Sequence, residues 1–276
     1  LSHTSGLPPF KRFYLMDAPN VDALWDSVFA CNPETVPGQK YAYSDIGSLI
    51  LGQIVERIGG DPLDVFMDEH IFTPLGMTNT GFQPKGRYDK DRIMPTEYEM
   101  DGNLLHGVAL DENCQAFGGI TGHSGLFSTA ADLSIFCQMM LNQGSLGDTQ
   151  IFKPETVELF TSRANIVTNS SRCLGWDSPA STSSGGVYLS SNSFGHTGFT
   201  GTSLWIDPEN QMFVILLTNA VHPNRSDKYP NYFDWRQYLH SSVYESEGIT
   251  LRNEDLEWRE RWLMKLSLSG GGFLDK

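Results

Sequence analysis

A chain of 276 residues with 39% hydrophobic and 19% charged residues has the composition of a soluble globular protein, large enough for one large domain or two small ones. Its formal net charge of -14 argues against nucleic acid and anionic membrane surfaces as partners, because both would repel it. No apolar run approaches the roughly 18–20 residues that cross a bilayer, so we expect no membrane span.

The start of the chain and its cysteines give two further expectations. The first residue is Leu1, without a charged and then apolar leader, so we expect a fragment or a product cut from something longer. The cysteines form no CxxC pair, which excludes a zinc ribbon; they are Cys31, Cys114, Cys137 and Cys173. We interpret them as small buried residues, and a disulfide between two of them stays open.

The region from about residue 20 to 165 carries mainly helical patterns. Five segments there have apolar residues at helical spacing or a helix-starting proline: 21–31 behind Asn20, 46–59 before Gly60, 62–70 behind Asp61, 130–140 behind Ser128 or Thr129, and 154–161. Gly81–Leu110 lacks such periodicity, which predicts a long surface excursion. Gly118–Leu126 is a glycine-dense loop.

Strand patterns dominate the region from about residue 174 to 219. The candidates are 174–177, 186–189, 202–207 and 212–218, the last two joined into a hairpin by a turn at 208–210. Because Met212–Leu217 is continuously apolar, we expect a central strand buried on both faces. Helices are expected to follow over 232–244 and 254–266.

Two short motifs carry side chains that suit catalysis. Tyr43 stands directly before a predicted helix and could shuttle protons if neighbouring cations lowered its pKa. Alternatively, Ser44 or Asp45 caps the helix and Tyr43 packs beneath it. His196-Thr197-Gly198 could offer a partly cationic imidazole, a hydroxyl and a backbone N–H, or could be an ordinary strand end with a satisfied histidine.

Other catalytic templates are absent from the sequence. The string from Gly122 to Leu126, GHSGL, is one residue short of a GxSxG nucleophile elbow. There is no HExxH, the seven histidines show no helical metal spacing, and no GxGxxG or P-loop string follows a strand. We therefore expect neither a metal nor another cofactor.

The combination of motifs is more specific than its parts. In chain order they are LSHTSGLP at Leu1–Pro8, Tyr43-Ser44-Asp45, PLGM at Pro74–Met77, GGITGHSGLFSTAADL at Gly118–Leu133 and HTGFTG at His196–Gly201. From Leu1 to about Tyr244 this order resembles the serine β-lactamase-related family, which includes class C β-lactamases, D,D-peptidases and family VIII-type esterases. The resemblance implies an α/β (α+β) sandwich of the β-lactamase/transpeptidase type, with an antiparallel sheet flanked by helices.

The resemblance also implies roles for particular residues. Tyr43 matches the family's proton-relaying tyrosine, Asp45 replaces its usual asparagine, and His196 stands where class C enzymes carry lysine. Because histidine holds a carboxylate less firmly at neutral pH, this favours peptidase or esterase chemistry over β-lactam hydrolysis. The cleft would be completed by Thr197, Gly198, the Phe199 N–H as an oxyanion donor, Gly118 and Gly119. We expect Tyr43 and His196 to meet across one groove.

The family's nucleophile motif, SxxK, is missing, since none of the eight lysines has a serine three residues before it. We expect that motif upstream, together with the first strands of the sheet, so that the isolated chain would be inactive and poorly soluble. The resemblance implies an extracytoplasmic serine hydrolase acting on amide or ester bonds of a small molecule or peptide through an acyl-enzyme.

Two alternatives are a catalytically inactive binding or scaffold protein and a peptidoglycan-recognition module without turnover. We divide the chain into a β-lactamase-related domain over residues 1–245 and a C-terminal helical extension over 246–276.

Overall fold

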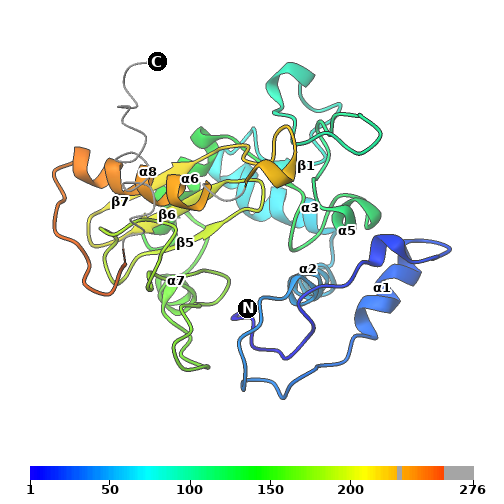
Figure 1. Cartoon of the computed structure of the whole chain (residues 1–276), viewed down its shortest axis with the longest axis horizontal. Coiled ribbons are helices and arrows are strands. Elements are labelled where there is room, and N and C mark those ends of the chain that lie inside the picture. Colours follow the sequence, from blue (N-terminus) through cyan, green and yellow to red (C-terminus); the bar gives the residue numbers. More distant parts are fainter. Residues whose placement is uncertain (229–231, 258–276) are drawn as a thin grey trace.

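The computed structural model describes residues 1–228 and 232–257, and in them a helical part and a small antiparallel sheet lie side by side (Figure 1). The helical elements are the 3-10 helices Phe13–Leu15, Lys90–Arg92 and Arg225–Lys228, the π-helix Asp68–Phe72, and α1 Val21–Phe29, α2 Asp45–Gly59, α3 Leu63–Met67, α4 Thr73–Leu75, α5 Glu112–Ala116, α6 Ala130–Leu141, α7 Pro154–Thr161 and α8 Tyr232–Ser246. The strands are β1 Gly81–Phe82, β2 Leu126–Phe127, β3 Ser145–Leu146, β4 Thr149–Gln150, β5 Phe194–Thr197, β6 Ser203–Asp207 and β7 Met212–Leu216.

The main sheet has the order β5-β6-β7, and each neighbouring pair is antiparallel. Side chains alternate between its two faces. Phe213 and Ile215 of β7 join a core cluster with Met139 of α6, whereas Val214 joins a second cluster with Tyr244 of α8. The predicted apolar run is therefore covered on both faces, as its composition indicated.

The expected central position of this run is wrong, because β7 is an edge strand among the described residues and β6 is central. Trp205 and Ile206 of β6 are at most 1% exposed, whereas every residue of β7 is only partly buried. Helices on both faces demand an apolar strand whether or not a further strand pairs with it. The apolar run of β7 therefore indicated that both faces of the strand are covered, but not the order of the strands in the sheet.

Two of the four predicted strands do not form. Asp177 makes isolated bridges with Arg172 and Gly195, and Val187 and Leu189 are fully buried without strand pairing. The Val187 N–H donates to Ser241 Oγ at 3.2 Å instead of to a neighbouring strand. The sheet accordingly begins at Phe194, not at residue 174.

The helical part follows its local signals closely. Asn20, Ser44 and Thr129 each accept a backbone N–H as the N-cap of α1, α2 and α6. Gly60 ends α2 with φ +88°, a conformation that favours glycine. These helix starts and the α2 stop confirm the prediction, as does α7 at Pro154–Thr161.

The third predicted helix is longer than expected. It runs through α3, the π-helix and α4, and ends at Gly76 with φ +70° instead of at His70. Its N-cap is Pro62, without a side-chain hydrogen bond, so the expected Asp61 cap is wrong.

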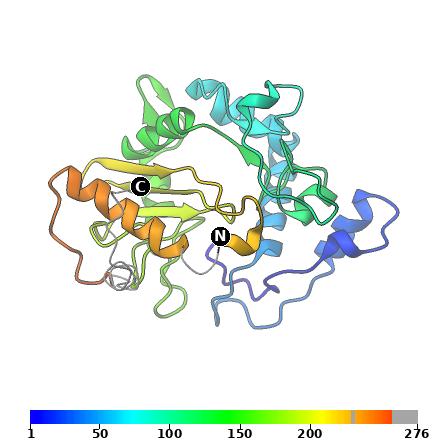
Figure 2. The same ribbon diagram turned by 45° about the horizontal axis from the view of Figure 1, so that its top comes forward.

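The N-terminal segment lies between the two parts of the molecule in both views (Figures 1 and 2). The Leu1 carbonyl accepts the Gly175 N–H at 3.0 Å, and His3 accepts the Ser44 N–H at 3.1 Å through its Nδ1. These few residues therefore join the helix α2 to the loop in front of the sheet.

The end of the described chain packs against the sheet. Ile249 and Leu256 join the core cluster of Trp205 and Tyr244. Residues 247–257 contain no helix, and most of the helix predicted at 254–266 lies outside the described residues. The division at residue 245 stays a prediction.

Candidate functional site

Tyr43 and His196 lie side by side, although one precedes α2 and the other belongs to β5. Their ring centroids are 6.2 Å apart at an interplanar angle of 35°. His3 also stacks on Tyr43, with centroids 4.1 Å apart. The structure thus brings together the two side chains that were expected to meet.

Local hydrogen bonds at Ser44 fix the position of Tyr43. The Ser44 hydroxyl accepts the Gly47 N–H at 3.0 Å and donates to the Pro8 carbonyl at 2.7 Å. The expected cap is therefore real, but Tyr43 does not pack beneath it, because its side chain remains 43% exposed. Capping and presentation of the phenol coexist.

Arg172 completes this cluster, and no sequence argument had selected it. Its Nη1 donates to His196 Nε2 at 3.0 Å, and its guanidinium carbon lies 5.2 Å from the Tyr43 ring and 5.8 Å from the Tyr41 ring. Asp177 lies 3.8 Å from its Nη2, and the Arg172 side chain is only 13% exposed. In the sequence, Arg172 lies in a polar loop without a recognisable motif around it, so no local pattern identifies it as a site residue.

The hydrogen bonds of His196 determine its tautomer. Arginine can only donate, so His196 Nε2 is the acceptor and Nδ1 carries the proton, which it donates to the Thr197 carbonyl at 2.9 Å. Burial and then the charge of Arg172 lower the pKa of His196. The expectation of a partly cationic imidazole is therefore wrong, and the cation at this place is Arg172.

Tyr43 and Asp45, at the start of α2, form what we call the helix side of the site. The pKa values of both are raised, which favours their neutral forms. Burial and the nearby Asp45 raise the pKa of Tyr43, and the opposing effect of Arg172 is smaller. The condition that cations lower the Tyr43 pKa is thus not met among the described residues. Burial also raises the pKa of Asp45.

Near Asp45, a histidine and a second carboxylate form a partly buried pair. His123 Nε2 lies 2.9 Å from Asp111 Oδ1, and His123 Nδ1 lies 3.0 Å from the Thr121 hydroxyl. The charge of His123 opposes the rise in the Asp45 pKa. Within residues 1–228 and 232–257, the Asp45 carboxylate makes no hydrogen bond of its own.

The loop after β5 presents a backbone donor. Gly198 donates to the Thr202 carbonyl at 2.8 Å, and a Cβ at Gly198 would come within 2.2 Å of Thr202 Oγ1. The Phe199 N–H finds no acceptor in the described part of the chain, and the Phe199 side chain is 55% exposed. Its predicted role as an oxyanion donor is thus compatible with its free N–H.

Gly118 and Gly119 lie on the helix side, with φ of +90° and +87°. The Gly119 N–H donates to the Cys114 carbonyl at 2.8 Å, and Gln83 donates to the Gly118 carbonyl. No interaction within the described residues joins either glycine to Tyr43 or His196. Their place in the cleft stays a prediction.

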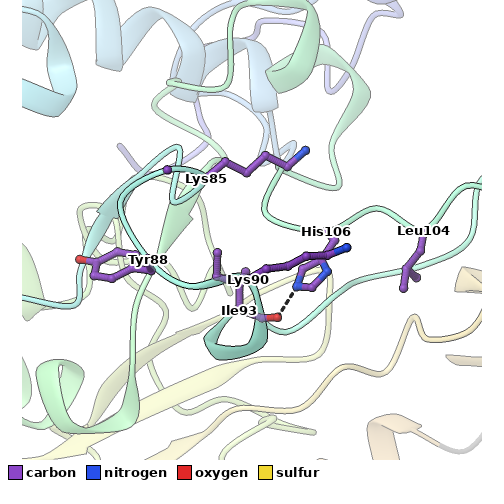
Figure 3. A pocket seen from close by; sticks show the side chains of 7 residues that line it. Lys85, Tyr88, Lys90, Ile93, Leu104 and His106 are labelled. Atoms are coloured by element: carbon purple, nitrogen blue, oxygen red, sulfur yellow. Dashed lines mark hydrogen bonds between the residues drawn. The ribbon is translucent and has the colours of Figure 1, made fainter.

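A separate cavity of about 330 Å³ lies within the long excursion that follows β1 (Figure 3). Its lining side chains all come from residues 85–106, and His106 hydrogen-bonds to the Ile93 carbonyl. None of the predicted site residues lines it; the lining residues are Lys85, Gly86, Tyr88, Lys90, Ile93, Leu104 and His106.

The four cysteines are free, and all but Cys31 are buried, in agreement with their interpretation as small core residues. In the part of the chain that the structure describes, no cluster of histidine, cysteine, aspartate or glutamate side chains could hold a metal ion. Over the same residues, no helix is long and apolar enough to cross a membrane.

Comparison with known proteins adds the family. The Beta-lactamase family model matches residues 1–239. The chain belongs to the β-lactamase family. A protein of Escherichia coli (strain K12) with the provisional name D-alanyl-D-alanine carboxypeptidase is 38% identical over 223 residues, which cover 73% of this chain and 50% of that protein.

A second relative is the N-acetylmuramyl-L-alanine amidase of Bacillus subtilis (strain 168). It is 35% identical over 266 residues, which cover 86% of this chain and 59% of the amidase. The chain therefore spans about half the length of the curated relatives it matches.

Solved structures share the fold at low identity. The LovD6 mutant of simvastatin synthase from Aspergillus terreus superposes with a TM-score of 0.63 at 22% identity, covering 90% of this chain and 64% of that one. EstCE1, a hydrolase with promiscuous acyltransferase activity, gives 0.60 at 20% identity, covering 88% and 70%. The predicted β-lactamase/transpeptidase-like fold, with helices and an antiparallel sheet, is confirmed.

Proposed function

We propose that this chain forms part of a serine hydrolase that cleaves amide or ester bonds through an acyl-enzyme. The observation that carries the proposal is the meeting of Tyr43 and His196, with ring centroids 6.2 Å apart. These are the residues that match two of the family's three site elements. Two relatives named as a carboxypeptidase and an amidase support hydrolysis of an amide bond.

The nucleophile of the proposed reaction lies outside the given sequence. No lysine of this chain has a serine three residues before it, so the SxxK element must come from elsewhere in the protein. Its serine would attack the carbonyl carbon and form the acyl-enzyme, while Tyr43 relays the serine proton to the leaving group. The raised pKa of Tyr43 suits a phenol that holds its proton between transfers.

The other side of the site, which we call the sheet side, is formed by β5, the loop after it and Arg172. It would receive an anionic group of the substrate. Arg172 supplies a fixed cation, and its Nε–H is buried with no partner among the described residues. A neutral His196 holds this guanidinium in place through Nε2. The substrate class is therefore a peptide or small molecule with a carboxylate close to the bond that is cleaved, in a protein placed outside the cytoplasm.

Acylation of the full-length protein that contains this chain tests the proposal. A fluorophosphonate or penicillin probe should add one equivalent to the SxxK serine, as measured by intact mass and peptide mapping. The 276-residue chain alone should take up no probe. A folded full-length protein that binds muropeptides but forms no adduct and no product would instead identify the inactive binding protein.

A further inference from the structure

The loop that follows β5 is tied to the segment before α8 through three successive carbonyls. The Thr200 carbonyl accepts the Ala220 N–H at 2.7 Å, and the Gly201 carbonyl accepts the Thr218 hydroxyl at 2.8 Å. The Phe199 carbonyl accepts Lys228 Nζ at 2.5 Å. These three carbonyls of the loop therefore all accept from the segment before α8.

A further hydrogen bond, within the loop, sets the direction of the Phe199 N–H, because this N–H and the Gly198 carbonyl belong to the same peptide unit. The Gly198 carbonyl accepts the Gly201 N–H at 3.1 Å, which closes a tight turn. In a trans peptide the carbonyl and the N–H of the same unit point in opposite directions. The Phe199 N–H, which has no acceptor among the described residues, therefore points away from the turn.

Lys228 contacts Phe199 in two ways. Besides its hydrogen bond to the Phe199 carbonyl, its Nζ lies 4.3 Å from the centroid of the Phe199 ring. The side chain is only 5% exposed, although burying a lysine is costly unless its ammonium finds partners. The hydrogen bond to the Phe199 carbonyl and the contact with the Phe199 ring help to offset this cost.

We propose that Lys228 is a positioning residue that holds Phe199 so that its N–H faces the carbonyl oxygen of the bound substrate. This inference rests on the proposed function, since it needs an acyl transfer in which an oxyanion forms. Loss of a whole oxyanion donor typically costs about 10²–10³ in rate. Loss of its positioning should cost less, about 10-fold to 100-fold in the acylation rate, with little change in substrate binding.

The test measures how well the site recognises an oxyanion. An ester and the matching thionoester differ only in the atom that becomes the anion, and sulfur is the weaker hydrogen-bond acceptor. The full-length protein should therefore prefer the ester. In Lys228→Met the ester rate should fall more than the thionoester rate, so that the preference shrinks, whereas KM should hardly change.

Three further variants make the outcome decisive. Lys228→Arg, which keeps a charged donor, should restore most of the ester preference. Tyr232→Phe, which removes a hydroxyl that also donates to the Gly201 carbonyl, should shrink the preference in the same direction even if Lys228→Met does not fold. Lys85→Met, at an exposed lysine of the separate cavity, should change nothing.

The outcomes separate the two proposals. An inactive wild-type protein would overturn the proposed function itself. An active wild-type protein whose Lys228 variants lose stability but keep the ester preference would overturn the positioning role alone.

Discussion

The helix side and the sheet side of the site differ in charge. On the helix side, burial favours neutral Tyr43 and weakens the acidity of Asp45. On the sheet side, Arg172 and Lys228 place two mostly buried cations around β5 and its loop. Under the proposed function, this difference would assign proton transfer to the helix side and recognition of negative charge to the sheet side.

The largest expected effect is on the helix side. Tyr43→Phe removes only the hydroxyl and should lower the acylation rate of the full-length protein by about 10²–10⁴-fold, the usual worth of a positioned proton-transfer group. Stopped-flow kinetics with a chromogenic ester measure it. Tyr41→Phe is the matched control, because its ring also lies near Arg172 and should lose little. Equal rates for both variants would remove Tyr43 from the reaction.

On the sheet side, Arg172→Gln should lower kcat/KM for a substrate with a free carboxylate by about 10-fold to 100-fold, since a hydrogen bond to a charged group contributes about 1.5–3 kcal/mol. The methyl ester of the same substrate should lose little. Arg87→Gln, in the exposed excursion, is the control. An equal loss for the acid and its methyl ester would mean that Arg172 is structural.

The same substitution tests the charge state of His196. Burial and Arg172 both lower the His196 pKa, so Arg172→Gln should raise it toward the ordinary value. NMR titration of the imidazole measures this. An unchanged His196 pKa would contradict the assigned hydrogen bond.

The two sides also differ in how far the sequence predicts them. The α2 start at Ser44 and stop at Gly60 depend on neighbouring residues, so local patterns were sufficient. Tyr43 and His196 are candidates from their short motifs, and only the resemblance to a family assigns their roles and predicts that they meet. Arg172 and Lys228 are cations whose roles depend on contacts made at long range, and nothing in their neighbours distinguishes them from surface residues.

Strand order was also beyond local patterns. The apolar run of β7 reports that both of its faces are covered, but the partner at each edge depends on the whole fold. Val187 and Leu189 illustrate the converse, because burial alone did not make them a strand.

Stability should fall in acid because of two histidines, His240, which is buried, and His3, which is partly buried. Burial lowers the pKa of His240 to about 3 and that of His3 to about 4. Below pH 6.5 these histidines become protonated in the unfolded chain but stay neutral in the folded chain. Their contribution to the free energy of unfolding is therefore fully present above pH 6.5 and is lost as the pH falls. In this pH range each of the two histidines lowers the free energy of unfolding by up to about 1.4 kcal/mol per pH unit.

Thermal unfolding of the full-length protein between pH 8 and pH 5 measures this slope. His240→Gln and His3→Gln should each flatten it over the same part of this range, because both folded-state pKa values lie below pH 5. A slope that neither variant changes would assign the acid sensitivity to other groups.

The smallest effect separates capping from catalysis. Ser44→Ala and Thr129→Ala each remove an N-cap side chain and should each cost about 1 kcal/mol in the free energy of unfolding. Only Ser44 adjoins Tyr43, so only Ser44→Ala should slow acylation, by a few fold. Urea unfolding and ester kinetics on both variants check this; equal activity would show that the cap does not position Tyr43.

The most direct test of a single shared site is a double-mutant cycle across its two sides. Acylation rates would be measured for Tyr43→Phe, His196→Ala and the double variant of the full-length protein. Residues that act in one site couple, so the double variant should be little slower than the slower single variant. Two losses that simply multiply would contradict a site shared by Tyr43 and His196.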